Sequence, residues 1–305
     1  MITGAGFGLA SCPSLGLLAT SDDEYDTITV WSVPRDCGNG GLVHVCTLGG
    51  GFSTAPMQFK FSHSWASGYL AFTPANSRPL LLVTDACQGA VHIVDVVSQT
   101  HVGYVASPGS LAGSRGVAAC ETSPLVAVSV WNRYDSIDQR VVVFSGSGAQ
   151  WESVRVIRGW HHPAQLRLPI GLRFSADGSC ICVANTGSDR ISLFRVSDGE
   201  YVRHTITRYP FDVVEVKGGW LVACQTKYHG FVHDDFHVEC NSFAVATMPG
   251  LGVILRRPFY VEGTKGSQIM VFSNVDTMSM WTMSGMRVAW MTVVARGIMC
   301  CFRRR

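Results

Sequence analysis

An internal repeat is the sequence feature that most constrains how this chain folds. Its clearest copy spans residues 166–202, where four short runs are rich in β-forming residues. The runs are Gly171–Phe174, Cys180–Ala184, Ile191–Arg195 and Tyr201–Thr205. The turn signals Asp177-Gly178, Gly187-Ser188 and Asp198-Gly199 separate them. Four short strands joined by tight turns form one antiparallel meander, which is the unit of a β-propeller blade.

The same pattern recurs along the chain at a constant offset. An Asp or Asn stands six residues before the first residue of an alternating apolar strand in three copies: Asp22 before Ile28, Asp85 before Val91, and Asn185 before Ile191. Another copy contains Val141–Phe144 and has extra residues within 131–139. Residues 209–238 supply a fifth copy, with its third strand expected near Gly230–His233. Val253–Leu255 followed by Ile269–Phe272 supplies the sixth.

Six copies predict an all-β fold, a six-bladed β-propeller of four-stranded antiparallel blades over residues 1–276. The composition of 47% hydrophobic and 15% charged residues agrees, because it excludes intrinsic disorder and coiled coil. Residues 277–305 hold six of the ten Met and five Arg but no acid. Their apolar spacing predicts a short C-terminal helical or irregular tail. This tail is expected to pack on the propeller, to dock on a partner or to touch an anionic membrane.

The motif of blade four resembles the NHL repeat. Its elements are Leu168-Pro169-Ile170-Gly171, Asp177-Gly178, Val183-Ala184-Asn185, Asp189-Arg190-Ile191, Leu193-Phe194 and Asp198-Gly199. The other blades keep only parts of it. The resemblance implies a six-bladed propeller and a role as an adaptor for protein or RNA, sometimes beside ubiquitin-ligase modules. This chain has no RING-type Cys/His spacing, so in such a pathway we expect it to act by binding.

Four residues belong to a structural turn motif. Asp22, Asp85 and Asn185 follow the second strand of a blade, where an Asx side chain hydrogen-bonds nearby backbone. Arg190, just before a third strand, is positioned to pair with such a carboxylate or carboxamide, and Arg140 resembles it. These positions are expected to stabilise turns rather than to take part in chemistry.

Two loops are the predicted binding surface. The extra turn of blade three contains Trp131, Arg133 and Tyr134, the residue types enriched at interface hot spots. The loop before blade four adds Trp160, His161 and His162. An alternative is that Trp131 folds back over the adjacent blade, because an exposed Trp without a partner is unfavourable. The leading prediction is a non-catalytic recognition scaffold that binds a protein partner through these loops.

RNA is the less favoured macromolecular partner. Residues 1–276 carry 19 basic and 22 acidic side chains, a charge of −3. An RNA-binding domain is usually basic, because phosphate neutralisation supplies much of its affinity. The sequence does not indicate whether a small molecule binds.

A metal-dependent propeller enzyme is the main alternative, and its candidate ligands are His229, His233 and His237 beside acidic residues. The fold resembles that of peptidyl-amidoglycolate lyases, which use zinc-bound histidines. It also resembles the gluconolactonase and strictosidine-synthase-like group, whose members bind a divalent ion through carboxylates and amides at the ends of inner strands. In this chain, that resemblance implies Asn185, Asp212 and Asp85 as the ligands. The histidines do not repeat blade by blade, and hydrolase and phosphate-loop motifs are missing. We therefore expect no cofactor.

The eleven cysteines contain no Cys-x-x-Cys pair, and most lie in apolar runs. They are expected to be small buried hydrophobes in a reducing compartment. The first ten residues lack the basic region and apolar core of a secretory signal, and no uncharged apolar run reaches 18 residues. These features predict a cytoplasmic location.

Overall fold

A computed structural model describes most of the first two thirds of the chain and the strands of the last third. The described residues are 8–22, 27–33, 42–49, 67–74, 78, 80–131, 139–159, 161, 163–207, 209–216, 219–227, 239–247, 253–257, 269–274, 277–284, 287–294 and 297–299. From residue 214 onward the description covers the backbone only.

The described strands form six antiparallel sheets of four strands, each built from consecutive strands. The first sheet contains β1 (Leu9–Cys12), β2 (Leu17–Asp22), β3 (Thr27–Ser32) and β4 (Val43–Gly49). The second contains β5 (Ser67–Phe72), β6 (Leu80–Asp85), β7 (Ala90–Asp95) and β8 (Thr100–Ala106). The third contains β9 (Ser114–Ala119), β10 (Leu125–Val130), β11 (Arg140–Ser147) and β12 (Gln150–Ile157). The fourth contains β13 (Pro169–Phe174), β14 (Cys180–Asn185), β15 (Arg190–Arg195) and β16 (Tyr201–Ile206). The fifth contains β17 (Pro210–Val216), β18 (Gly219–Lys227), β19 (Glu239–Thr247) and β20 (Val253–Arg257). The sixth contains β21 (Ile269–Asn274), β22 (Thr277–Ser284), β23 (Arg287–Val294) and β24 (Gly297–Met299). Short 3-10 turns span Pro13–Leu15 and Thr186–Ser188.

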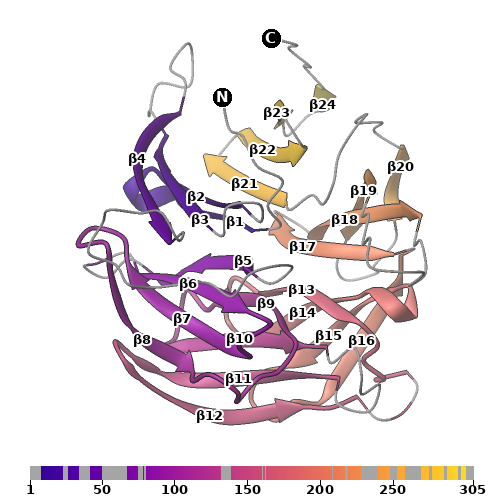
Figure 1. The fold of residues 1–305 in the computed structure, drawn as a ribbon. Coiled ribbons are helices and arrows are strands. Elements are labelled where there is room, and N and C mark those ends of the chain that lie inside the picture. Colours follow the sequence, from indigo (N-terminus) through magenta and orange to yellow (C-terminus); the bar gives the residue numbers. More distant parts are fainter. Residues whose placement is uncertain are drawn as a thin grey trace.

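The six sheets are arranged in a ring (Figure 1). The first strand of each sheet is innermost, and each contacts the first strand of the next sheet from β1 through β21. β1 also contacts β21, so the N-terminal and C-terminal sheets close the ring without sharing a strand. The described part of the chain is therefore a β-propeller with six four-stranded blades, as the repeat predicts.

The strand assignment of blades five and six differs from the prediction. The third strand of blade five is β19, not Gly230–His233, which lies outside the described residues. Val253–Leu255 belongs to β20, the fourth strand of blade five, and Ile269–Phe272 belongs to β21, the first strand of blade six. Alternation with a period of two identifies a strand but does not say which place it takes in a blade.

The helical or irregular tail predicted for residues 277–305 is wrong for its described residues, 277–284, 287–294 and 297–299. Residues 277–299 contain three strands, β22, β23 and β24, which join β21 in one antiparallel sheet. The runs are rich in Thr and Val, whose β-branched side chains favour strands. Gly285 and Gly297 interrupt the run near the strand boundaries, which shortens any helix that could form.

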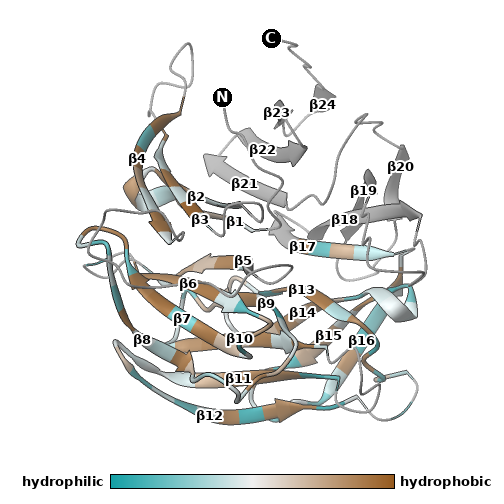
Figure 2. Cartoon of the chain, in the orientation of Figure 1, coloured by the Kyte–Doolittle hydropathy of each residue, from teal (hydrophilic) through white to brown (hydrophobic). Residues whose placement is uncertain are grey.

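The core of blade four matches the predicted alternation. The six side chains expected to be buried are at most 8% exposed: Leu172, Phe174, Ile181, Val183, Ile191 and Leu193. Several of them pack with residues of blade three, including Val141 and Ile157, in one hydrophobic cluster. Figure 2 shows hydrophobic residues along the strands of blades one to four. Apolar burial between blades thus joins the repeats, as expected where a single blade cannot bury both of its faces.

The innermost strands approach each other closely enough to require glycine. A Cβ atom on Gly116 would lie 2.3 Å from the carbonyl oxygen of Ile170. The Gly116 N–H donates to Ser129 Oγ (2.8 Å), and the Ser129 hydroxyl donates to Ile170 O (2.6 Å). The Thr186 hydroxyl likewise donates to Pro210 O (2.6 Å) between blades four and five. These bonds satisfy inner-strand backbone groups and connect neighbouring blades.

Candidate functional site

The antiparallel blades place their connections on two opposite faces. The innermost strand of each blade begins at one face, which we call the start face, and ends at the other, the far face. In blades three and four the start face carries the β10–β11, β12–β13, β14–β15 and β16–β17 connections. Both loops of the predicted binding surface therefore belong to the start face.

The predicted binding residues are only partly described. Trp131 is 6% exposed, and its ring packs under the guanidinium of Arg115, whose Cζ lies 5.1 Å from the ring centre. This agrees with the alternative in which Trp131 folds back on the propeller. His161 is exposed at the start face. Arg133, Tyr134, Trp160 and His162 lie outside the described residues, so their binding role stays a prediction.

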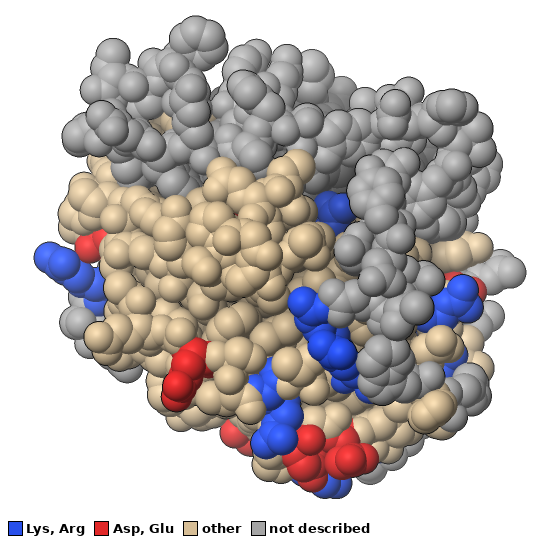
Figure 3. All heavy atoms as spheres, turned by 60° about the horizontal axis from the view of Figure 1, so that its bottom comes forward, with Lys and Arg blue, Asp and Glu red and all other residues tan. Residues whose placement is uncertain are grey.

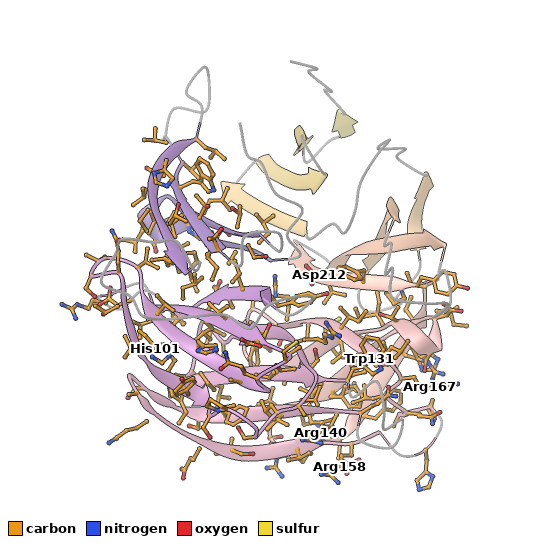
Figure 4. The ribbon with its side chains drawn as sticks, in the orientation of Figure 1. His101, Trp131, Arg140, Arg158, Arg167 and Asp212 are labelled. Atoms are coloured by element: carbon orange, nitrogen blue, oxygen red, sulfur yellow. The ribbon has the colours of Figure 1, made fainter. Side chains whose placement is uncertain are left out.

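Figure 4 shows Arg140 and Arg158 as neighbours in blade three and Arg167 apart from them, toward blade four. Arg140 is the first residue of β11 and is half-buried, whereas Arg158 follows the end of β12 and is exposed. Burial lowers the pKa of Arg140, and the positive charge of Arg158 lowers it further. The two guanidinium groups are therefore close enough to repel each other. Arg167, in the connection to β13, is exposed.

Asn185 holds the loop that carries Arg167. Its buried side chain accepts a hydrogen bond from the Arg167 N–H (2.6 Å) and donates one to the carbonyl of Gln165 (2.7 Å). The Gly187 N–H donates to the Arg167 carbonyl (2.8 Å). Asn185 thus bonds backbone 18 and 20 residues before it, rather than the local backbone that an Asx turn predicts. Its role is to attach the β12–β13 connection to blade four.

Replacing Asn185 by Ala should lower the free energy of unfolding by about 1–3 kcal/mol, because it leaves a backbone donor and acceptor of the loop without their partner. Denaturant unfolding measures this, and hydrogen exchange should show faster opening of residues 163–168. The Asn185→Asp variant keeps only the acceptor and should restore protection at Arg167. A loss smaller than about 0.5 kcal/mol, the scale of surface substitutions, would contradict the anchoring role.

Arg190 bonds backbone carbonyls instead of the predicted carboxamide. Its Nε donates to Ser188 O (3.2 Å) and its NH1 donates to Pro163 O (2.9 Å). Arg190 therefore also holds the β12–β13 connection. Both acceptors are carbonyl oxygens, so these bonds do not neutralise the Arg190 charge.

Asp85 makes the local bond that its turn motif predicts, since Oδ1 accepts from the Gln88 N–H (2.9 Å). Its Oδ2 lies 3.8 Å from Nε2 of the buried His92, whose ring lies near those of His101 and Tyr104. Burial and the neighbouring His92 lower the pKa of His101. The side chain of Asp22 lies outside the described residues.

Among the described side chains, no group of three or more His, Cys, Asp and Glu could hold a metal ion. The candidate ligands His229, His233 and His237 lie outside the described residues. The described cysteines are free thiols, and Cys12, Cys46, Cys120 and Cys182 are buried as expected. None of the helices in the described ranges is long and apolar enough to cross a membrane.

The far face of blade four carries two acidic turns. Asp177, in the β13–β14 turn, accepts hydrogen bonds from Ser175 and Ser179, which lower its pKa. Asp198, in the β15–β16 turn, accepts from the Glu200 N–H and pairs with Arg195. On the start face, the carboxylate of Asp189 accepts from the Tyr209 N–H (2.9 Å). Figure 3 shows a row of adjoining basic side chains and, toward the lower edge of the same view, further basic side chains that adjoin acidic ones.

The arginine group could have been found from the sequence only in part. Arg140, Arg158 and Arg167 flank the two loops that the sequence singles out. Their common position, however, requires knowing that both loops belong to the same face. The pairing of β11 with β12 supplies that information.

The fold is shared with solved β-propellers. A functionally unknown protein from Desulfotomaculum acetoxidans is similar at 10% identity, with a TM-score of 0.63 over 99% of this chain and 86% of that chain. The β-propeller domain of Myceliophteria thermophila Cps50 (Swd1) has 12% identity and a TM-score of 0.57, covering 100% and 87%. A nidogen/laminin complex has 14% identity and a TM-score of 0.57, covering 84% and 80%. No family model and no curated protein matches the sequence. At these identities, the likeness concerns the fold alone.

Proposed function

We propose that this chain is a non-catalytic recognition scaffold that binds a protein partner through the start-face loops of blades three and four. One observation carries the proposal: the β10–β11 and β12–β13 connections, which the β11–β12 hairpin separates in the sequence, share one face of a ring whose core is closely packed, and arginines flank them. Loops on a rigid scaffold are a common location for recognition, because the scaffold limits the conformational entropy lost on binding.

We further propose that the blades are of the NHL type, which the nearly complete motif of blade four supports. The protein then serves in the cytoplasm as an adaptor in a ubiquitin-ligase-like pathway. The motif supports the adaptor role, and the buried thiols among the described cysteines support the location. One of the similar structures is itself a complex, of nidogen with laminin, which agrees with a propeller acting as a protein-binding unit.

The test replaces residues 132–138 by a short Gly-Ser turn and compares proteins captured by the tagged full chain in its source cells. We expect the loop variant to lose its specific partner by about tenfold or more, the effect of removing hot-spot contacts. Its melting temperature should stay within a few degrees of the parent, because Trp131 and Gln139 are kept.

The matched control is the far-face double variant Asp198→Asn with Glu200→Gln, which should capture the same partner as the parent. Equal capture by the loop variant and the parent would contradict the proposal. Ligase subunits among the captured proteins would support the adaptor role. Stoichiometric Zn²⁺ or Ca²⁺ retained by the purified chain would instead favour the metal-dependent enzyme.

A further inference from the structure

We infer that Gln139 is a positioning residue that joins the two loops of the proposed recognition surface into one unit. These loops are the β10–β11 connection, which contains Arg133 and Tyr134, and the β12–β13 connection, which contains His161. The inference rests on the proposed function and extends it, because a partner would then meet both loops in one fixed arrangement.

The two ends of the β10–β11 connection are bonded to different neighbouring connections. The Trp131 N–H donates to the carbonyl of Gly113 (2.9 Å), which lies between blades two and three. At the other end, the half-buried side chain of Gln139 accepts a hydrogen bond from the Leu168 N–H through its Oε1 atom. Leu168 lies between blades three and four. The insertion of blade three is therefore attached to the inter-blade connection on each side of it.

Leu168 has a backbone conformation that depends on such bonds. Its φ is +48°, in the left-handed region, which is unfavourable for a residue with a Cβ atom. Its N–H is bonded to Gln139, and its carbonyl accepts a hydrogen bond from the Thr186 N–H (3.2 Å). A strained conformation persists only where the surrounding structure fixes it. Loss of the Gln139 acceptor should therefore release the β12–β13 connection at Leu168.

The rest of the β12–β13 connection has a fixed base. The Leu166 N–H donates to the carbonyl of Gly159 (3.2 Å), and the Leu166 side chain is buried in the cluster between blades three and four. A Cβ atom on Gly159 would lie 1.8 Å from the carbonyl oxygen of Ala164, so the chain closes tightly here. Asn185 and Arg190 bond the same segment to blade four. Gln139 thus links the inserted loop to a connection that is already held in place.

A joined pair of loops suits recognition because it is ordered before the partner arrives. Two independent loops would each lose conformational entropy on binding, which weakens the affinity. The Gln139 bond lowers this cost without any contact between Gln139 and the partner. Its loss should therefore weaken partner binding while the propeller core stays intact.

Hydrogen exchange of the full chain tests the joining of the loops. The Gln139→Ala variant should take up deuterium about tenfold faster at the amides of residues 164–168, because their connection loses one hydrogen bond. The Gln139→Glu variant keeps an acceptor oxygen and should restore slow uptake. The matched control is Gln165→Ala, which removes an exposed glutamine side chain from the same connection and should leave uptake unchanged. Uptake in β14 and β15 should also stay unchanged, which a general loss of stability would not allow.

Partner capture by the tagged full chain in its source cells tests the positioning role. The Gln139→Ala variant should capture about threefold less of the specific partner than the parent, because the loops must then be ordered on binding. The Gln139→Glu variant should capture as much as the parent. The control for this measurement is Gln150→Ala, an exposed residue at the far-face end of β12, which should also match the parent.

The joining of the loops is wrong if the Gln139→Ala variant leaves uptake at residues 164–168 unchanged, if Gln165→Ala speeds it equally, or if Gln139→Glu fails to restore it. Faster uptake with undiminished capture, in a chain whose 132–138 variant loses the partner, would overturn the positioning role. If the 132–138 variant loses the partner and uptake in Gln139→Ala is unchanged, the recognition function stands without this inference. If uptake rises but the 132–138 variant keeps the partner, the proposed recognition is wrong and the attachment of the loops stands.

Discussion

The Phe194→Ala variant is expected to lose about 3–5 kcal/mol of unfolding free energy, because it removes a whole ring from a buried junction between blades. Phe194 is 1% exposed and packs edge-on against Tyr201, with ring centres 6.0 Å apart. Its cluster includes Ile157 of blade three as well as Leu172 and Ile181 of blade four. The cavity left at this junction adds to the lost transfer free energy, because rigid sheets collapse little around it.

Denaturant unfolding followed by tryptophan fluorescence and circular dichroism measures this loss. The control is Val202→Ala on the outer strand β16, where the side chain is 41% exposed and the change should stay within about 0.5 kcal/mol. A Phe194→Ala loss as small as that of the control would mean that the junction of blades three and four is not a closely packed core.

The Gly171→Ala variant should lose about 3 kcal/mol or more, although it adds only a methyl group. The new Cβ would lie 2.4 Å from Asp212 Oδ1, 2.6 Å from Asp212 Cα and 2.7 Å from the carbonyl oxygen of Phe211. Two of these atoms are backbone of β17, so a side-chain rotation does not remove the clash. Strands β13 and β17 must separate, which exposes apolar surface between blades four and five.

Thermal unfolding of Gly171→Ala beside Gly148→Ala tests this explanation. Gly148 has a φ of +57° and nothing within 4 Å of its Cβ position, so its replacement carries only the backbone cost of roughly 1 kcal/mol. The Gly171 variant should melt at a clearly lower temperature than the Gly148 variant. The reverse order would show that backbone conformation, and not the approach of the inner strands, makes glycine necessary at residue 171.

The candidate site is only partly predictable from the sequence. The composition of the loops around Trp131 and His161 indicates a binding surface, because aromatic, Arg and His residues stand where other blades have short turns. The same composition does not distinguish an exposed Trp from one that packs beneath Arg115. Nor does it show that Arg140 and Arg158 are neighbours, since 18 positions separate them and only the β11–β12 register brings them together.

The sequence alone determined the all-β class, the propeller repeat and the core of blade four, because these follow from local properties. The predicted count of six blades agrees with the structure, although the sequence places all six within residues 1–276 and the structure builds the sixth from β21 to β24. Alternation with a period of two selects strands, and turn residues at regular spacing divide them into repeats. The tertiary structure decided which strand takes which place in the last two blades and that residues 277–299 form strands rather than a helix. A short apolar run fits both the helical period of about 3.6 residues and the strand period of two. Pairing with β21 supplies the backbone hydrogen bonds that select the strand. The same dependence on long-range pairing made the arginine group visible only in the folded chain.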